Sequence, residues 1–186
     1  MRLAFFLVFF LALALAGCAT PRIVVLSDPL DAREHNDLGA SYETSGELDL
    51  ALKAYETAAA SDRSWDQPFI NMGNVHAALG DWTQAAASYQ QALKRNPENP
   101  EAMNNLAYAL VNLDKPREAL EWSSKAVQVE PGNPLFRATL AQALAGSGER
   151  QKALALLAET LETLSVDDPL REKIAALRDQ IANSAP

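Results

Sequence analysis

The sequence predicts an all-α solenoid built from pairs of helices. The main observation is a period of 34 residues, at which a large apolar residue followed by a small one recurs. The series is Leu38-Gly39, Met72-Gly73, Leu106-Ala107 and Leu140-Ala141. A second series of small residues keeps the same interval: Ala51, Ala85, Ala119 and Ala153. A fixed period of this size indicates a solenoid, because each repeat is one supersecondary unit that stacks on the next.

Composition excludes several classes of function. The chain has 186 residues with 24 Asp and Glu against 16 Lys and Arg, a formal charge of −8. This balance argues against binding a phosphate backbone, which needs clustered basic side chains, so no nucleic-acid partner is expected. A single cysteine excludes an intrachain disulfide or a thiolate zinc cluster. Two histidines leave little material for a histidine-based metal site.

The first element, residues 1–17, reads as a signal peptide. No polar side chain occurs from Leu3 to Ala16, and this run is shorter than the roughly 20 residues that a spanning helix needs. It ends in Leu15-Ala16-Gly17-Cys18, which resembles the lipobox of bacterial lipoproteins. The alternative is an ordinary signal peptide with a chance cysteine. The resemblance implies cleavage before Cys18, acylation of the new N-terminus and a firm membrane anchor. Ala19 in the next position resembles the signal for the outer membrane of a diderm bacterium, with the protein on its periplasmic face.

Residues 18–31 read as a lipidated tether. Pro21 favours extended chain. The apolar run from Ile23 to Leu26 either packs on the first helices or forms an edge strand for a partner. Asp28-Pro29 reads as the N-cap and first-turn proline of the first helix.

The helix boundaries of the repeats follow from their turn residues. Gly46, Gly80 and Gly148 separate two amphipathic stretches, where a residue with positive φ ends the first helix. Asp81 can cap the helix that follows, and Pro116 suits a first helical turn. A capping residue followed by proline opens later helices at Asn99-Pro100, Asn133-Pro134 and Asp168-Pro169. Between the two helices of a repeat, we expect a close contact of Gly73 with Ala85.

This pattern resembles the tetratricopeptide repeat, a helix–turn–helix unit of 34 residues, and the resemblance implies a right-handed superhelix. The repeats map to residues 32–65, 66–99, 100–133 and, in degenerate form, 134–167. Residues 168–183 form a capping helix, with an apolar stripe at Leu170, Ile174, Leu177 and Ile181.

No catalytic constellation is evident. The sequence contains no phosphate-binding glycine loop, no HExxH and no GxSxG. His76 falls where the family places large packing residues, and Cys18 would carry lipid. We therefore expect no enzyme activity, no cofactor and no metal. The alternative is an accessory module for an envelope enzyme encoded elsewhere, or a degenerate enzyme.

The first helices of the repeats carry the candidate binding residues. In the family these helices line a concave groove, and the matching positions here are rich in asparagine, whose amide suits an extended peptide backbone. The candidate residues are Asn36, Ile70, Asn71, Asn74, Asn104, Asn105, Tyr108, Asn112 and Gln142. Asp37, Glu43 and Glu101 make the groove mildly negative, so we expect a neutral or basic extended segment, with Tyr108 as its aromatic anchor.

The resemblance as a whole implies a membrane-anchored scaffold that binds a partner protein or peptide in the bacterial envelope. Family members of this kind serve pilus or secretion assembly or recruit cell-wall enzymes. The sequence does not select among these roles, and it leaves the oligomeric state open.

Overall fold

The computed structural model describes residues 28–184, and within this range the chain forms helices and no strand. The predicted all-α repeat fold is confirmed. The helices are α2 (Ala32–Thr44), α3 (Leu48–Ser61), α4 (Gln67–Ala78), α5 (Trp82–Arg95), α6 (Pro100–Asn112), α7 (Pro116–Val129), α8 (Pro134–Gly146), α9 (Arg150–Thr163) and α10 (Pro169–Asn183). Cys18 and the apolar run from Ile23 to Leu26 lie outside the described residues.

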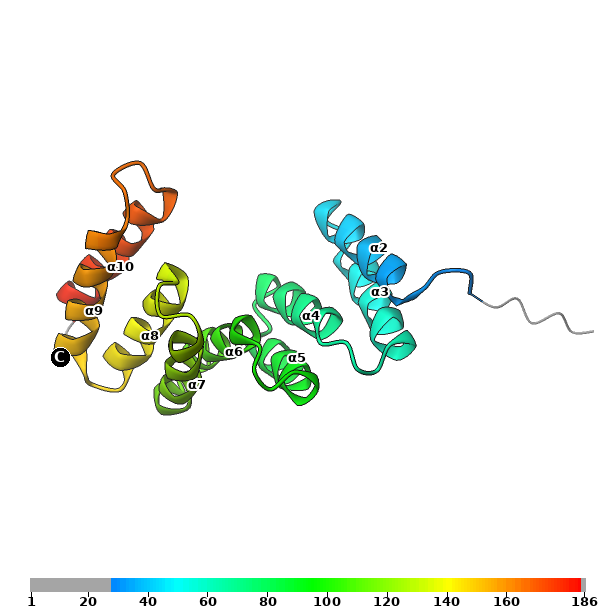
Figure 1. Cartoon of the computed structure of the whole chain (residues 1–186), viewed down its shortest axis with the longest axis horizontal. Helices are drawn as coiled ribbons and strands as arrows, with labels where there is room; N and C mark the ends of the chain where they lie inside the picture. The colour runs from blue at the N-terminus through cyan, green and yellow to red at the C-terminus, as the bar shows by residue number, and fades with distance from the viewer. Residues whose placement is uncertain (1–27, 185–186) are drawn as a thin grey trace, which may run out of the picture.

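The helices form a curved row in which each packs on the next (Figure 1). Two helices fall within each 34-residue segment of the sequence period. The first helices of successive segments also meet, since α2 contacts α4, α6 contacts α8, and α8 contacts α10. These helices therefore share one inner surface, on which side chains from separate repeats come together.

Side-chain caps fix where the helices begin. Asp81, Asn99 and Asp168 accept hydrogen bonds from backbone N–H groups of the first turns of α5, α6 and α10, as the sequence predicts. The prediction for the first helix was wrong, because α2 is capped by Asp31. Its carboxylate accepts from the N–H groups of Arg33 and Glu34, and the Glu34 carboxylate accepts from the Asp31 N–H, which completes a capping box.

Positive φ angles end the first helices at the predicted glycines. The angles are 79° at Gly46, 77° at Gly80 and 87° at Gly148. In the third repeat the equivalent residue is Asp114, at a φ of 56°. Aspartate tolerates this conformation better than most residues, which explains how the repeat keeps its turn without glycine.

The close contact inside each of the first two repeats joins a glycine to a tyrosine ring. A Cβ atom built on Gly39 would lie 2.5 Å from the Tyr55 ring, and one on Gly73 would lie 2.3 Å from the Tyr89 ring. The nearest side chain to Gly73 is thus Tyr89, one helical turn beyond the expected Ala85. Because glycine has no Cβ atom, the tyrosine ring can approach the backbone of the first helix this closely.

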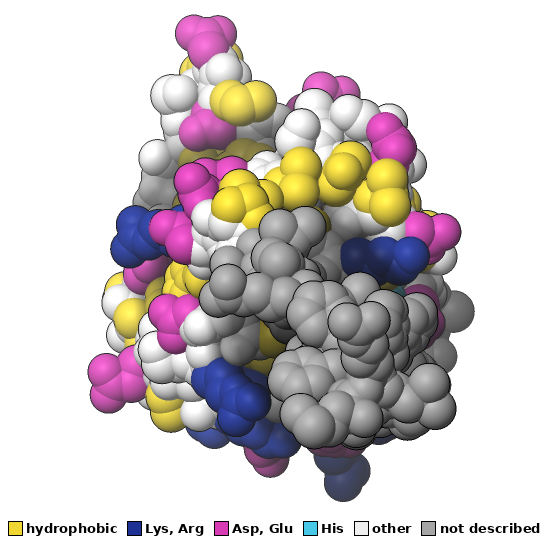
Figure 2. Space-filling view, turned by 90° about the vertical axis from the view of Figure 1, so that its right-hand side faces the viewer, with side chains coloured by type: hydrophobic (Ala, Val, Ile, Leu, Met, Phe, Trp, Pro, Cys, Tyr) yellow, Lys and Arg dark blue, Asp and Glu magenta, His cyan; other side chains and the backbone are white. Residues whose placement is uncertain are grey.

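The described part of the chain contains no helix long and apolar enough to cross a membrane. On the face shown in Figure 2, acidic side chains are interspersed with small groups of Lys and Arg. That face does not present the continuous basic surface that a phosphate backbone requires.

Candidate functional site

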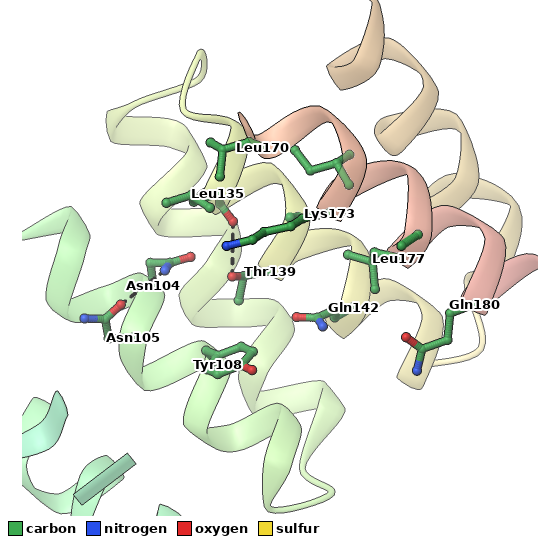
Figure 3. A pocket seen from close by; sticks show the side chains of 13 residues that line it. Asn104, Asn105, Tyr108, Leu135, Thr139, Gln142, Leu170, Lys173, Leu177 and Gln180 are labelled. Carbon is green, nitrogen blue, oxygen red and sulfur yellow. Dashed lines mark hydrogen bonds between the residues drawn. The ribbon is translucent and has the colours of Figure 1, made fainter. Parts of the chain in front are cut away.

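A pocket of about 560 Å³ opens on the inner surface where α6, α8 and α10 meet (Figure 3). We call it the α6–α8–α10 pocket. Its lining consists of Asn104, Asn105, Tyr108, Leu135, Ala138, Thr139, Gln142, Leu170, Lys173, Ile174, Ala176, Leu177 and Gln180. Two repeats and the capping helix therefore contribute to one site.

The apolar part of the pocket includes two large side chains that the fold leaves uncovered. Leu135 is 51% exposed and Tyr108 is 41% exposed. The Tyr108 ring is held edge-on against Trp82, with centroids 5.6 Å apart and an interplanar angle of 82°. A ligand that covered Tyr108 and Leu135 would bury apolar surface without having to order the tyrosine ring first.

The polar part consists mainly of neutral groups. Asn104 Nδ2 donates to Asn105 Oδ1 at 3.3 Å, and Thr139 Oγ1 donates to the Leu135 carbonyl at 3.2 Å. Asn104 is only 8% exposed, and its Oδ1 atom has no hydrogen-bond partner. A buried acceptor without a donor costs about 1–3 kcal/mol, so the site favours a ligand that supplies an N–H group.

Asparagines elsewhere on the inner surface link neighbouring repeats. Asn71 Nδ2 donates to Asn36 Oδ1 at 2.8 Å, which joins α4 to α2. Asn74 Oδ1 accepts from Asn105 Nδ2 at 3.3 Å, which joins α4 to α6, and also from the Tyr89 hydroxyl at 2.8 Å. These amides use part of their hydrogen-bonding capacity within the protein. Their abundance thus has a structural role that their spacing alone did not reveal.

Two acidic side chains, Glu101 and Asp66, lie close enough to interact at the start of α6. Desolvation raises the pKa of Glu101, and the nearby Asp66 carboxylate raises it further. The pKa of the Tyr89 hydroxyl is raised by burial and then by Glu101. In contrast, no Asp or Glu lines the α6–α8–α10 pocket, and its one charged lining residue is Lys173.

The structure places the predicted groove residues in three groups. Asn104, Asn105, Tyr108 and Gln142 line the pocket. Asn36, Asn71, Asn74 and Asn112 do not line it, and the Asn112 amide donates to the Tyr108 carbonyl at 2.8 Å. The prediction for Ile70 was wrong, since this side chain is 0% exposed. It is packed in a cluster with Ala102 and Leu106, because the following repeat stacks over it.

Sequence reasoning missed the wall that α10 contributes. Leu170 and Leu177 belong to the apolar stripe assigned to capping, and Lys173 lies outside that stripe, yet all three line the pocket. The capping role is present, because Ile174 and Ile181 pack with the buried residues of α9. The sequence offered no signal for this second role, because the stripe has the narrow spacing that one neighbouring helix can cover.

The comparisons with known proteins agree on one family. Tetratricopeptide-repeat models match residues 70–134 and 134–159. The chain is 27% identical over 134 residues to Hsp70-Hsp90 organizing protein 3 of Arabidopsis thaliana, a match that covers 68% of this chain but only 24% of that protein.

Two solved structures show the same fold. One is YrrB, described as a tetratricopeptide-repeat protein with an unusual peptide-binding site, with a TM-score of 0.67, 24% identity, and coverage of 81% of this chain and 76% of that one. The other is the first such domain of Spaghetti (RPAP3) bound to the HSP90 peptide SRMEEVD, with a TM-score of 0.59, 20% identity, and coverage of 71% and 99%. With the helical repeats and these matches together, the chain belongs to the tetratricopeptide-repeat family.

Proposed function

We propose that this protein is a lipid-anchored adaptor of the bacterial cell envelope that holds an extended segment of a partner protein on its inner surface. The observation that carries the proposal is the α6–α8–α10 pocket, where Tyr108 and Leu135 remain exposed beside hydrogen-bonding amides. Such a combination of apolar anchors and a few polar groups is typical of ligand-binding sites. The proposed role is binding without catalysis.

Similarity to known proteins supports the binding part of the proposal. The Spaghetti (RPAP3) neighbour holds a peptide, and YrrB is described as having a peptide-binding site. The chain spans 24% of the length of the plant organizing protein, so that protein's partners are not transferred to this one. What we carry over is the mode of binding, a peptide held by a helical scaffold.

The membrane part of the proposal depends on the lipobox-like sequence that ends in Cys18. Acyl chains there would place the repeats at the periplasmic face of the outer membrane in a diderm bacterium. More than one acyl chain holds a protein stably, since each buried methylene contributes about 0.8 kcal/mol. A partner would then be captured close to the bilayer, in a pilus or secretion assembly or beside a cell-wall enzyme.

The test is recovery of partners from detergent-solubilised membranes with two double variants. Tyr108→Ala with Leu135→Ala removes the exposed apolar side chains of the pocket. Leu79→Ala with Val129→Ala is the matched control, because these residues are 55% and 51% exposed and do not line the pocket. We expect the first pair to lose a protein that the parent and the control retain, while helicity by circular dichroism stays unchanged in all three. Identical sets of recovered proteins would show that the pocket is not the binding site.

A further inference from the structure

We propose that the apolar run from Ile23 to Leu26 docks on α2, along a face that the described part of the chain leaves uncovered. The run then acts as a fixed support between the start of the mature chain and the repeats, instead of a free tether. Four observations carry this inference: an uncovered helix face, its small size, the place where the described chain begins, and the charge of the first repeat.

One face of α2 lacks the cover that the later first helices have. Each of α4, α6 and α8 packs on the second helix of the repeat before it, whereas no helix precedes α2 in residues 28–184. The difference is visible at equivalent positions, 34 residues apart. Leu38 is 36% exposed, Met72 is 8% exposed and Leu106 is 0% exposed. An occupant that covers Leu38 therefore buries apolar surface where a preceding repeat would do so.

The uncovered face is narrow, and this selects a small occupant. Glu34 and Ser41 are exposed on α2. The matching residues of α6, Ala102 and Ala109, are both 0% exposed. Polar residues on either side of Leu38 thus leave little apolar area, whereas a stable interface with a second copy needs roughly 800 Å² on each partner. A segment of the same chain loses no translational freedom on docking, so a narrow strip is sufficient for it.

The described chain begins against α2. The Nε2 atom of the buried His35 lies 3.1 Å from Asp28 Oδ2, close enough for an ion pair when the imidazole is protonated, although the two groups are not aligned for a hydrogen bond. Asp28 Oδ1 also accepts a hydrogen bond from the Leu30 N–H at 3.0 Å. Leu38 follows His35 by three residues, so the two are neighbours on one side of α2. The chain therefore enters the fold on the side that carries the uncovered leucine.

The apolar run is close enough to Asp28 to reach Leu38. Its four residues lie two to five positions before Asp28, which places their Cα atoms within roughly 7–18 Å of the Asp28 Cα atom. Leu38 is only about 5 Å farther along the axis of α2 than His35. Three of the four residues are β-branched, which favours an extended backbone with alternate side chains on opposite sides. Two aliphatic side chains can therefore pack on α2 at once.

Charge favours the same docking. Residues 28–66 contain ten Asp and Glu against three Lys and Arg, so the first repeat is strongly acidic. Figure 2 views the molecule from this end and shows acidic side chains beside a row of hydrophobic ones. Residues 18–27 include Arg22, next to the apolar run, and no acidic residue. Attraction between Arg22 and the acidic repeat therefore adds to the apolar contact.

Docking shortens the link between Cys18 and the folded repeats. With the run docked, only residues 19–22 span the gap, about 13–14 Å when fully extended. With the run free, residues 19–27 span about 30–32 Å. The first repeat is thus held beside the bilayer in one orientation. This consequence rests on the lipid anchor of the proposed function, whereas the docking itself does not.

The experiment measures backbone order by NMR in the lipid-free mature chain, residues 18–186. We expect order parameters of about 0.8 or higher for the apolar run, where a free tether stays below about 0.6. Methyl groups of the run should show nuclear Overhauser contacts with those of Leu38. Leu38→Ser should lower the order parameters of the run to those of a free tether. Val129→Ser is the control and should leave them unchanged, because Val129 is 51% exposed on α7, which packs on α6 and α8.

Two matched double variants test which side chains dock. Ile23→Ser with Val25→Ser changes one side of the extended run, and Val24→Ser with Leu26→Ser changes the other. We expect one pair to lower Tm by about 4–8 °C and to free the run, and the other pair to stay within about 2 °C of the parent. Helicity by circular dichroism should be unchanged in both.

Several results would overturn the inference. Order parameters below about 0.6 in the parent would show a free tether, and an ordered run without contacts to Leu38 would place it elsewhere. Ordering that appears only at high protein concentration would assign the run to a second copy. Equal effects of the two double variants would exclude an extended segment with one side on α2. The lipid anchor is judged separately by membrane fractionation of Cys18→Ser, and its failure would remove the effect on membrane distance but not the docking.

Discussion

Replacing Gly73 by leucine should force apart the two helices of the second repeat. A Cβ atom there would lie 2.3 and 2.7 Å from two carbons of the Tyr89 ring, well inside van der Waals contact. The ring has no free direction in which to move, since Tyr89 is 3% exposed and its hydroxyl donates to Asn74 at 2.8 Å. The strain must therefore appear as a shift of α4 against α5.

The expected loss of stability can be worked out from these contacts. Overpacking costs about 1–3 kcal/mol, and leucine against a fixed ring falls at the upper end, about 3 kcal/mol. Leucine is a better helix former than glycine by roughly 0.8 kcal/mol, which offsets part of that cost. The net loss is about 2 kcal/mol, or roughly 4–8 °C in Tm for a chain of this size.

The assay is thermal unfolding followed by circular dichroism, with Gly132→Leu as the control. A Cβ atom on Gly132 would have no neighbour within 4 Å, so this change should stay within about 0.5 kcal/mol. Tyr89→Ser copies the third repeat, where Ser123 occupies the equivalent position. In that background Gly73→Leu should cost far less than in the parent. Equal Tm values for the two glycine variants, or additive effects of Gly73→Leu and Tyr89→Ser, would refute the assigned contact.

Three other changes test separate parts of the structure and the proposal. Cys18→Ser should leave an unprocessed precursor or a soluble form; a mature mass and normal recovery with membranes would refute the lipid anchor. Because the folded pKa of Glu101 is raised, its contribution to stability is fully present below the unfolded pKa and is lost as pH rises through the folded pKa. Glu101→Gln should therefore unfold at higher urea than the parent at about pH 7, with the difference vanishing near about pH 3, where both states are protonated. Asp114→Gly should stabilise the protein by up to about 1 kcal/mol, because its φ of 56° suits glycine better, and a lower Tm would contradict this reading of the turn.

Local features of the fold could be read from the sequence because their causes are local. The glycines at positive φ and the caps at Asp81 and Asn99 act within one helical turn, so residue type and spacing are enough to locate them. The first helix was misplaced because two aspartates compete to cap it. Asp31 is followed three residues later by Glu34, and this capping-box spacing is the signal that distinguishes it from Asp28.

The site was harder to predict because it depends on how separate repeats stack. Ile70 occupies a position that faces the groove in the family pattern, yet the next repeat covers it completely. Lys173 becomes a pocket residue only because α10 contacts α8 as well as α9. The angle between stacked helices follows from the packing of many side chains together, and the period of the sequence does not contain it.

Some asparagines of the inner surface link neighbouring repeats, whereas Asn104 lies at the pocket. From Asn36 to Asn105 their amides bond across the boundaries of the first three repeats, so this part of the inner surface is already ordered before any ligand arrives. Asn104 differs from these residues, because its Oδ1 has no hydrogen-bond partner and the residue lines the pocket. In the pocket, an unpartnered hydrogen-bond acceptor therefore lies beside the exposed apolar side chains of Tyr108 and Leu135. A partner peptide that binds there meets a preorganised scaffold, and its affinity should depend on pocket residues such as Tyr108 far more than on the asparagines of the first two repeats.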